Sequence, residues 1–208
     1  MTRPVKEPAG SMVRVISGRF RGLRLVSPAG RRTRPTADQV KEALFSMLVS
    51  LPFELNGCRA LDFFAGSGAL GLEALSRGAA SVVLADETQA AAQAVARNLA
   101  AAGRDLPATF LRTHWPQGFH RLPTDQPFDL LLLDPPYEKR SLPLALLREA
   151  GALNLAAPGA VAVWEQAPET LAAWSSLEAA PWIVLKTRVW DHQAVAFLQY
   201  PPGITDGD

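Results

Sequence analysis

From residue 60 onward, short apolar runs alternate with segments whose apolar residues recur at helical spacing. The apolar runs predict strands at residues 60–64, 81–86, 108–112, 128–133 and 160–165. The helical spacing predicts helices at residues 69–77, 88–102, 141–150 and 168–175. Two last apolar runs, 182–189 and 194–200, are separated by only four residues and predict a hairpin. This alternation indicates an α/β domain with a mostly parallel, doubly wound sheet.

The first 50 residues follow a different pattern. Alternation in Val13-Arg14-Val15-Ile16, a turn near Ser17-Gly18 and a return through Leu23-Arg24-Leu25 predict a two-stranded hairpin. Thr36-Ala37-Asp38-Gln39 has the capping-box pattern for a helix over residues 38–50. We therefore divide the chain into a disordered tail (1–11), a basic N-terminal hairpin (12–35) and one α/β domain (36–208).

Composition is that of an ordinary globular protein. The 208 residues are 48% hydrophobic and 20% charged, which is enough for one domain with a full core. Cys58 is the only cysteine, so no internal disulfide can form, and we interpret it as a small buried residue. No signal-peptide segment and no apolar run long enough to span a bilayer are present. We expect a cytoplasmic protein without membrane contact.

The charge is unevenly distributed. Residues 1–41 carry ten basic and two acidic residues, a net charge of +8, whereas the remainder carries −7. Such a split favours contact with a polyanion. The candidate phosphate contacts are Arg14, Arg19, Arg21, Arg24 and Arg34. The alternative is a solvated tail whose charges serve solubility.

A glycine turn links the predicted strand 60–64 to the predicted helix 69–77. Gly66, Gly68 and Gly71 match the G-x-G-x-x-G pattern of nucleotide-binding turns. Asp86 follows Gly66 by twenty residues, at the end of the next strand, where a ribose-binding acid is expected. Taken alone, this spacing is a dinucleotide fingerprint.

Asp62 argues against a dinucleotide. It precedes Gly66 by four residues, where a carboxylate would repel a pyrophosphate at the helix N-terminus. The same carboxylate suits a cationic ammonium group. S-adenosylmethionine has an α-ammonium group, a ribose diol and an adenine but no phosphate, so it fits Asp62 and Asp86 better. The alternative for Asp62 is an acid that caps the following loop.

Asp134-Pro135-Pro136-Tyr137 directly follows the apolar run 128–133. The prolines fix an extended backbone that leaves carbonyl groups free as acceptors. Asp134 and the Pro135 carbonyl can hold the two hydrogens of an exocyclic amine, while Tyr137 stacks on the base. The alternative is a strand-to-turn corner in which the prolines only end the strand.

Together, Asp62-Phe63-Phe64-Ala65-Gly66-Ser67-Gly68, Asp86 and Asp134-Pro135-Pro136-Tyr137 resemble a class I S-adenosylmethionine-dependent methyltransferase acting on an amino group. The basic segment 14–22 and Arg34-Pro35-Thr36 narrow this to the RsmD family, bacterial 16S ribosomal RNA guanine-N2 methyltransferases. The resemblance covers about residues 12–200. It implies a Rossmann-like seven-stranded methyltransferase sheet of order 3-2-1-4-5-7-6 with the last strand antiparallel, and a small basic N-terminal β-hairpin extension.

The resemblance also implies S-adenosylmethionine as cofactor, no metal, and 16S rRNA as partner within a 30S subunit or assembly intermediate. We expect a monomer. The implied cofactor contacts are Asp62, Phe64, Ala65, Gly66, Gly68, Asp86, Glu87, His114, Trp115 and Asp134. The implied catalytic residues are Asp134, Pro135, Pro136 and Tyr137, and Lys139 and Arg140 would hold the flanking RNA. Glu165, at the end of the strand 160–165, is a further candidate.

The chain departs from the family pattern at two positions. Glu87-Thr88 follows Asp86 where relatives have another acid or Asn two positions on. Thr113-His114-Trp115 stands where relatives have a small polar residue or Asp that binds the adenine amino group. Three readings stay open: His114 bonds to the adenine, Trp115 packs on it, or these side chains only cover the end of the sheet. His120, His192 and Cys58 lack metal-ligand spacing.

Three other functions remain open from the sequence. An adenine-N6 or other nucleic-acid amino-methyltransferase would use the same Asp-Pro-Pro-Tyr segment. An NAD-dependent oxidoreductase would use the glycines but leaves that segment without a purpose. A non-catalytic RNA-binding module would need only the N-terminal arginines.

Overall fold

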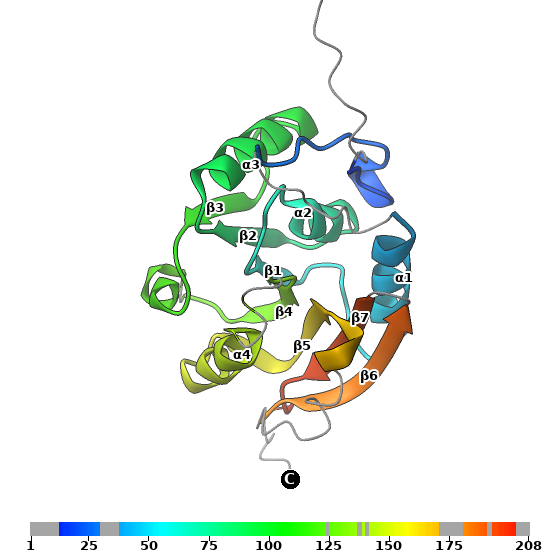
Figure 1. Cartoon of the computed structure of the whole chain (residues 1–208), viewed down its shortest axis with the longest axis vertical. Helices are drawn as coiled ribbons and strands as arrows, with labels where there is room; N and C mark the ends of the chain where they lie inside the picture. The colour runs from blue at the N-terminus through cyan, green and yellow to red at the C-terminus, as the bar shows by residue number, and fades with distance from the viewer. Residues whose placement is uncertain are drawn as a thin grey trace, which may run out of the picture.

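The computed structural model describes residues 13–29, 38–123, 125–136, 139, 142–170, 181–190 and 193–202 (Figure 1). The predicted tail 1–11 and the Thr36 end of the predicted capping box lie outside these residues. So do three predicted site residues, Arg34, Tyr137 and Arg140. Within the described part, no helix is long and apolar enough to cross a bilayer.

Seven strands form one mixed sheet. They are β1 Arg59–Asp62, β2 Ser81–Asp86, β3 Ala108–Arg112, β4 Phe128–Leu133, β5 Ala156–Gln166, β6 Ile183–Trp190 and β7 Gln193–Gln199. The order is β3-β2-β1-β4-β5-β7-β6. β7 is antiparallel to both β5 and β6, while the neighbouring pairs from β3 to β5 are parallel. The predicted fold class and strand order are confirmed.

The helices are α1 Asp38–Val49, α2 Ala69–Ser76, α3 Gln89–Ala102 and α4 Leu142–Ala152. Short 3-10 turns are η1 Gly18–Phe20, η2 Gln117–Arg121 and η4 Pro168–Thr170. The Thr88 hydroxyl caps α3 by accepting a hydrogen bond from the Ala91 N–H at 3.1 Å. The predicted helix 168–175 is represented by η4, and its remaining residues lie outside the described part.

Side-chain alternation along the strands gives the sheet two buried faces. Leu84, Leu132 and Val163 lie in the core cluster that α1 and α2 cover, whereas Val83 and Leu133 lie in the cluster with α4 and η2. Helices therefore flank both faces (Figure 1). Side chains two residues apart on a strand lie on the same face of the sheet. Asp62 and Asp86, at the carboxyl ends of β1 and β2, therefore lie on the face that α1 and α2 cover.

The predicted N-terminal hairpin forms only in part. Its two arms run antiparallel and are joined by hydrogen bonds such as Val15 N–H to Leu23 O at 2.9 Å and Leu25 N–H to Val13 O at 2.8 Å. They make one isolated bridge, Arg14 with Arg24, and not the two strands that the alternation predicts. The 3-10 turn η1 occupies the tip, so the ladder ends there.

Buried polar side chains of α2 and α3 fix this N-terminal segment to the domain. The Glu73 carboxylate accepts hydrogen bonds from the Ile16 and Ser17 N–H groups at 2.7 and 3.0 Å. Asn98 is bonded to both the N–H and the C=O of Val26 at 2.8 and 2.9 Å, and donates to the Ser67 carbonyl at 2.8 Å. These contacts hold residues 13–26 against α2 and α3, because the two side chains satisfy backbone groups of the segment that have no partner within it.

Gly18→Ala should destabilise the protein by about 1–3 kcal/mol more than Gly22→Ala, because overpacking adds to the same backbone strain. Both glycines have φ near +80°, so a side chain costs each about 1 kcal/mol in this left-handed region. A Cβ at Gly18 would lie 1.8 Å from the Ser76 carbonyl oxygen, whereas nothing lies within 4 Å of one at Gly22. Free energies of unfolding from denaturant titration test this difference. Equal losses in the two variants would show that η1 is not packed on α2.

Candidate active site

The glycine turn after β1 is closed by its own backbone. The Ala65 N–H donates to the Ala85 carbonyl at 2.9 Å, and the Gly68 N–H donates to the Ala65 carbonyl at 2.6 Å. Gly66 and Gly68 have φ of +53° and +81°. A Cβ at Gly71 would lie 2.3 Å from Leu84 Cδ2. These glycines therefore permit the tight turn and the close packing of α2 on β2.

Asp62 ends β1 beneath this turn and is 1% exposed. Its Oδ2 accepts a hydrogen bond from the Gly71 N–H at 3.1 Å, whereas its buried Oδ1 has no hydrogen-bond partner among the described residues. Burial raises the pKa of Asp62 to about 7; the charges of Asp134 and Asp86 act in the same direction and the Gly71 N–H opposes them. A buried carboxylate with an unpaired oxygen is a site for a cationic donor.

Asp86 ends β2 beside the same turn. One carboxylate oxygen accepts from the Gly66 N–H at 3.1 Å. The other accepts from both the N–H and the hydroxyl of Thr88, each at 2.9 Å. Asp86 is 4% exposed, and these contacts orient its carboxylate between the glycine turn and the start of α3.

An aromatic pocket lies next to Asp86. Its lining consists of Phe63, Phe64, Asp86, Glu87, Trp115, Pro136 and Lys139. The Trp115 indole N–H donates to the Phe63 carbonyl at 2.7 Å, and the Trp115 ring lies 4.8 Å from the Phe63 ring and 5.1 Å from the Phe119 ring, centroid to centroid. The pocket thus has an aromatic wall, built by the packed rings of Phe63 and Trp115, with carboxylates at its rim.

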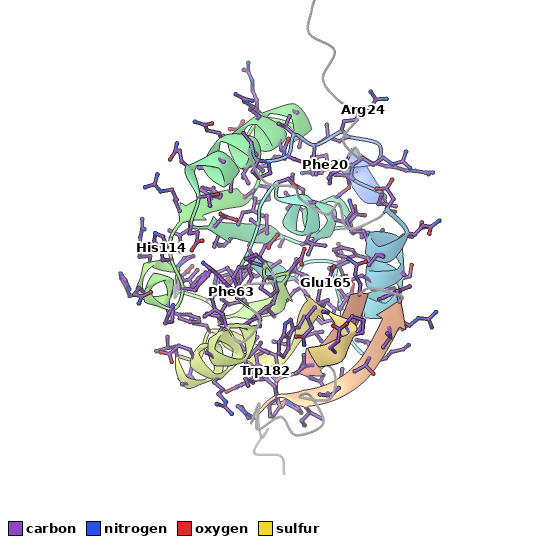
Figure 2. All side chains as sticks on the ribbon, in the orientation of Figure 1. Phe20, Arg24, Phe63, His114, Glu165 and Trp182 are labelled. Carbon is purple, nitrogen blue, oxygen red and sulfur yellow. The ribbon has the colours of Figure 1, made fainter. Side chains whose placement is uncertain are left out.

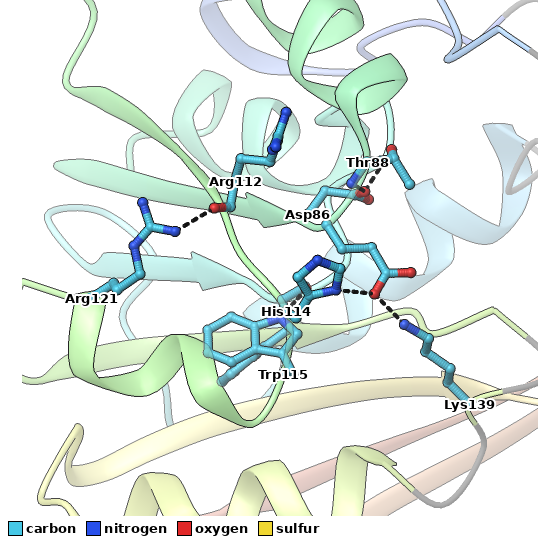
Figure 3. A network of polar contacts seen from close by, with 9 residues as sticks. Asp86, Thr88, Arg112, His114, Trp115, Arg121 and Lys139 are labelled. Atoms are coloured by element: carbon cyan, nitrogen blue, oxygen red, sulfur yellow. Dashed lines mark hydrogen bonds and ion pairs between the residues drawn. The ribbon is translucent and has the colours of Figure 1, made fainter.

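Glu87 joins His114 and Lys139 at the rim of this pocket (Figure 3). Its Oε2 lies 3.2 Å from His114 Nδ1 and also pairs with Lys139 Nζ. The hydrogen bond from Lys139 lowers the pKa of Glu87, with a further lowering by its charge and by His114. Lys139, which the sequence predicts to hold flanking RNA, pairs with Glu87 in the structure, and the His114 side chain is 75% exposed.

Four acidic residues stand in a row at the carboxyl ends of neighbouring strands. Asp86 and Asp62 end β2 and β1, Asp134 directly follows β4, and Glu165 lies near the end of β5. β2, β1 and β4 are neighbours in the sheet, so Asp86, Asp62 and Asp134 stand at adjacent strand ends. Pro136, two residues after Asp134, lines the aromatic pocket and accepts a hydrogen bond from the Lys139 N–H at 2.9 Å. The edge of the sheet thus combines an acidic row with an apolar pocket.

Four of the predicted RNA-binding arginines, Arg14, Arg19, Arg21 and Arg24, lie on the described N-terminal segment. Arg19, Arg21 and Arg24 are exposed. The Arg14 side chain pairs with Asp38 at 2.6 Å. Arg14, Arg21 and Arg77 line a second cavity between this segment, α1 and α2, together with Glu42 and Ser46. The segment therefore presents a basic surface on a fixed backbone.

Sequence reasoning missed the polar residues that support these two regions. Lys41 is fully buried and donates to the Arg14 carbonyl, and Glu73 pairs with Arg77 at 2.7 Å. In the sequence, Lys41 and Glu73 are marked only as charged residues within a mostly apolar stripe of a predicted helix. Phe63 was also missed as a pocket residue. Across the described residues, no cluster of three or more His, Cys, Asp or Glu side chains could hold a metal ion.

Comparisons with known proteins agree with this geometry. A family model described as "Conserved hypothetical protein 95" matches residues 13–197. YlbH of Bacillus subtilis (strain 168) is 40% identical over 131 residues, which span 62% of this chain and 70% of YlbH. Ribosomal RNA small subunit methyltransferase D of Escherichia coli (strain K12) is 43% identical over 100 residues, 48% of each chain, so the match spans about half of that enzyme.

Solved structures extend the similarity to nearly the whole chain. The protein yhhF of Escherichia coli aligns with a TM-score of 0.74 and 28% identity over 91% of this chain and 98% of its own. A hypothetical protein of Thermus thermophilus aligns with a TM-score of 0.66 and 28% identity over 89% of this chain and 98% of its own. The family match leaves the oxidoreductase alternative without support. The chain belongs to the RsmD/YlbH family of S-adenosylmethionine-dependent methyltransferases.

Proposed function

We propose that this protein transfers a methyl group from S-adenosylmethionine to the exocyclic N2 of a guanine in 16S ribosomal RNA, within a 30S subunit or an assembly intermediate. The observation that carries the proposal is the row of Asp86, Asp62 and Asp134 beside an aromatic pocket at one edge of the sheet. Relatives named ribosomal RNA small subunit methyltransferase D support the substrate class.

The residues present fit this cofactor. The unpaired Oδ1 of Asp62 suits the α-ammonium group, and Asp86 suits the ribose hydroxyls. The backbone around Phe64, Ala65, Gly66 and Gly68 would approach the ribose and the methionine part. When bound, S-adenosylmethionine supplies the electrophilic methyl group.

The adenine would pack in the aromatic pocket against Phe64 and Trp115. Because the Trp115 N–H is already bonded to the Phe63 carbonyl, Trp115 offers the adenine a packing surface and no hydrogen bond. Lys139 and His114 hold Glu87 at the pocket rim, where its carboxylate can accept from a polar group of the nucleoside.

The chemical step needs an amine whose hydrogens are held. The lone pair of a guanine N2 is delocalised into the ring, so the amine is a poor nucleophile in the plane of the base. Asp134 and the Pro135 carbonyl would each accept one N–H, and Pro136 and Tyr137 would keep the base in place. Fixing the amine next to the methyl group contributes mostly through proximity and orientation.

Methyl transfer in vitro tests the proposal. The purified chain is incubated with methyl-labelled S-adenosylmethionine and either free 16S RNA or 30S subunits from cells that lack this protein, and the RNA is digested to nucleosides. We expect label in N2-methylguanosine. Label in N6-methyladenosine would favour the adenine-specific alternative, and RNA binding without label in any nucleoside would favour a non-catalytic module.

Asp86→Ala should weaken S-adenosylmethionine binding by roughly 1.5–3 kcal/mol, the usual loss for a hydrogen bond to a charged group. Thr88→Ala is the matched control, because it removes one support of the Asp86 carboxylate but leaves the carboxylate itself. Calorimetric titration of both variants measures the effect. Wild-type affinity in Asp86→Ala would remove Asp86 from the cofactor site.

Binding of S-adenosylmethionine should strengthen with pH between about 5.5 and 7 and should release a proton, because the ammonium group needs ionised Asp62. The pKa of Asp62 is raised from its ordinary 3.8 to about 7, so the ligand-free folded state holds a proton that the unfolded chain has lost. Its stability should therefore fall from about pH 4 to about pH 7, with no further change from this group above that.

Asp62→Asn should abolish both effects. Calorimetry at pH 6 in two buffers of different protonation enthalpy measures the proton release, and denaturant titration across the pH range measures the stability. Identical binding heats in the two buffers would contradict the pairing of Asp62 with the ammonium group.

A further inference from the structure

Glu165 is a buried acid that the steps above do not use. It lies near the carboxyl end of β5 (Figure 2) and is 5% exposed. Its Oε1 accepts a hydrogen bond from Gln193 Nε2 of β7 at 2.6 Å. A buried carboxylate needs hydrogen-bond partners, and Gln193 is one of those of Glu165. Its place in the acidic row, on the strand next to β4, makes it a candidate contact for the base.

Strand register places Glu165 next to Asp134. β4 and β5 are parallel, with Leu132 opposite Val163 and Leu133 opposite Trp164, so the next pair is Asp134 and Glu165. Leu132 and Val163 lie in the core cluster under α1 and α2, and side-chain alternation directs both acids to that same face. Adjacent strands are about 4.8 Å apart, so one base can span both carboxylates.

The edge of guanine matches two neighbouring acceptors. Its N2 amine lies beside the N1–H, so both positions donate hydrogen bonds. In adenine the amine lies beside N1, which carries a lone pair and accepts. A carboxylate next to the one that holds the amine therefore attracts guanine and repels adenine, as base-edge patterns require.

We propose that Glu165 is a specificity-determining residue that accepts the N1–H of the guanine whose N2 amine Asp134 holds. This inference rests on the proposed methyl transfer to an RNA guanine. It adds the residue that selects the base, and it assigns Gln193 the part of a positioning residue that keeps the Glu165 carboxylate in place. The competing account is structural: Glu165 serves only to tie β5 to β7 through Gln193.

Glu165→Gln tests the proposal, because it keeps the shape of the side chain but replaces one acceptor oxygen with a donor. The substrate is a synthetic RNA fragment spanning the guanine that the wild type methylates, located beforehand by mass spectrometry. A second fragment has 2-aminopurine at that position; this base keeps the N2 amine but has an N1 acceptor in place of the N1–H. Single-turnover rates are measured on both fragments.

The wild type should methylate the guanine fragment at least about tenfold faster than the 2-aminopurine fragment, in line with the loss of one base-edge contact. In Glu165→Gln this ratio should fall to near one, because the amide can donate to the N1 acceptor. S-adenosylmethionine affinity should not change. Exposed Glu169 gives the matched control, and Glu169→Gln should keep the wild-type ratio.

Three outcomes are distinguishable. A Glu165→Gln variant that is slower on both fragments by the same factor would overturn the proposal in favour of the structural account. A wild type that methylates both fragments equally fast would also overturn it, while leaving transfer to N2 intact. A wild type that modifies no RNA guanine would refute the proposed function itself, and the inference with it.

Discussion

Asp134→Ala should lower single-turnover methylation by at least about a hundredfold, the range found when one transition-state hydrogen-bond partner is removed. Affinity for S-adenosylmethionine should stay within a few-fold, because the ammonium and ribose contacts are proposed for Asp62 and Asp86. The reason is the chemistry of the amine: its lone pair becomes available only while its hydrogens are held out of the plane of the base. Rapid-quench measurement with enzyme in excess over RNA isolates this step.

Asp134→Asn is the matched control. The amide retains one acceptor oxygen and the side-chain shape, so its rate should fall between those of the wild type and Asp134→Ala. The pKa of Asp62 should be lower in either variant, because the charge of Asp134 contributes to raising it. Near-normal turnover in Asp134→Ala would contradict the amine-holding role.

Reversing Arg19, Arg21 and Arg24 to Glu should abolish or greatly weaken binding of 16S RNA while leaving cofactor affinity nearly unchanged. In wild type, affinity should fall steeply with salt because each neutralised phosphate releases counterions, and the log-log slope of the variant should be shallower by roughly 2–3 units. The three side chains are exposed, so the melting temperature should change little.

A control variant reverses Arg104, Lys186 and Arg188, which are exposed on other parts of the chain. It has the same net charge as the first variant, so any general effect of charge is matched. The affinity of this control variant for 16S RNA should stay close to that of the wild type. If both variants and the wild type share one salt slope on 30S subunits, the N-terminal arginines serve solubility and not RNA binding.

The sheet was predictable because its signals are local. Each parallel strand is a short apolar run next to a helical pattern, and this periodicity alone gave six of the seven strand positions to within a few residues. β5 begins at Ala156, earlier than predicted. Pro158-Gly159 is typical of a turn, so the sequence predicts a later start. In the structure Ala156 pairs with Phe128, and a register shift separates this pair from the rest of the ladder. The N-terminal segment was not predictable in the same way, since Glu73 and Asn98 fix it across 56 to 72 residues of sequence.

At the site, the motifs located Asp62, Asp86 and Asp134 correctly at neighbouring strand ends, because carboxyl ends of parallel strands meet at one edge. The side chains between them were less predictable. The Trp115 side chain turns inward because its N–H donates to the Phe63 carbonyl, and the Lys139 side chain turns toward Glu87 because the two groups pair. These side-chain orientations depend on residues that are close in space but distant in sequence, so the spacing of motifs does not predict them.

The central claim is methylation of a guanine N2 in 16S RNA, and nucleoside analysis of that RNA from cells with and without this protein tests it most directly. We predict that N2-methylguanosine decreases in 16S RNA from the cells that lack the protein. A gene for the wild-type chain should restore it, and a gene for Asp134→Ala should not. Unchanged N2-methylguanosine, with loss of a different methylated nucleoside, would contradict the account.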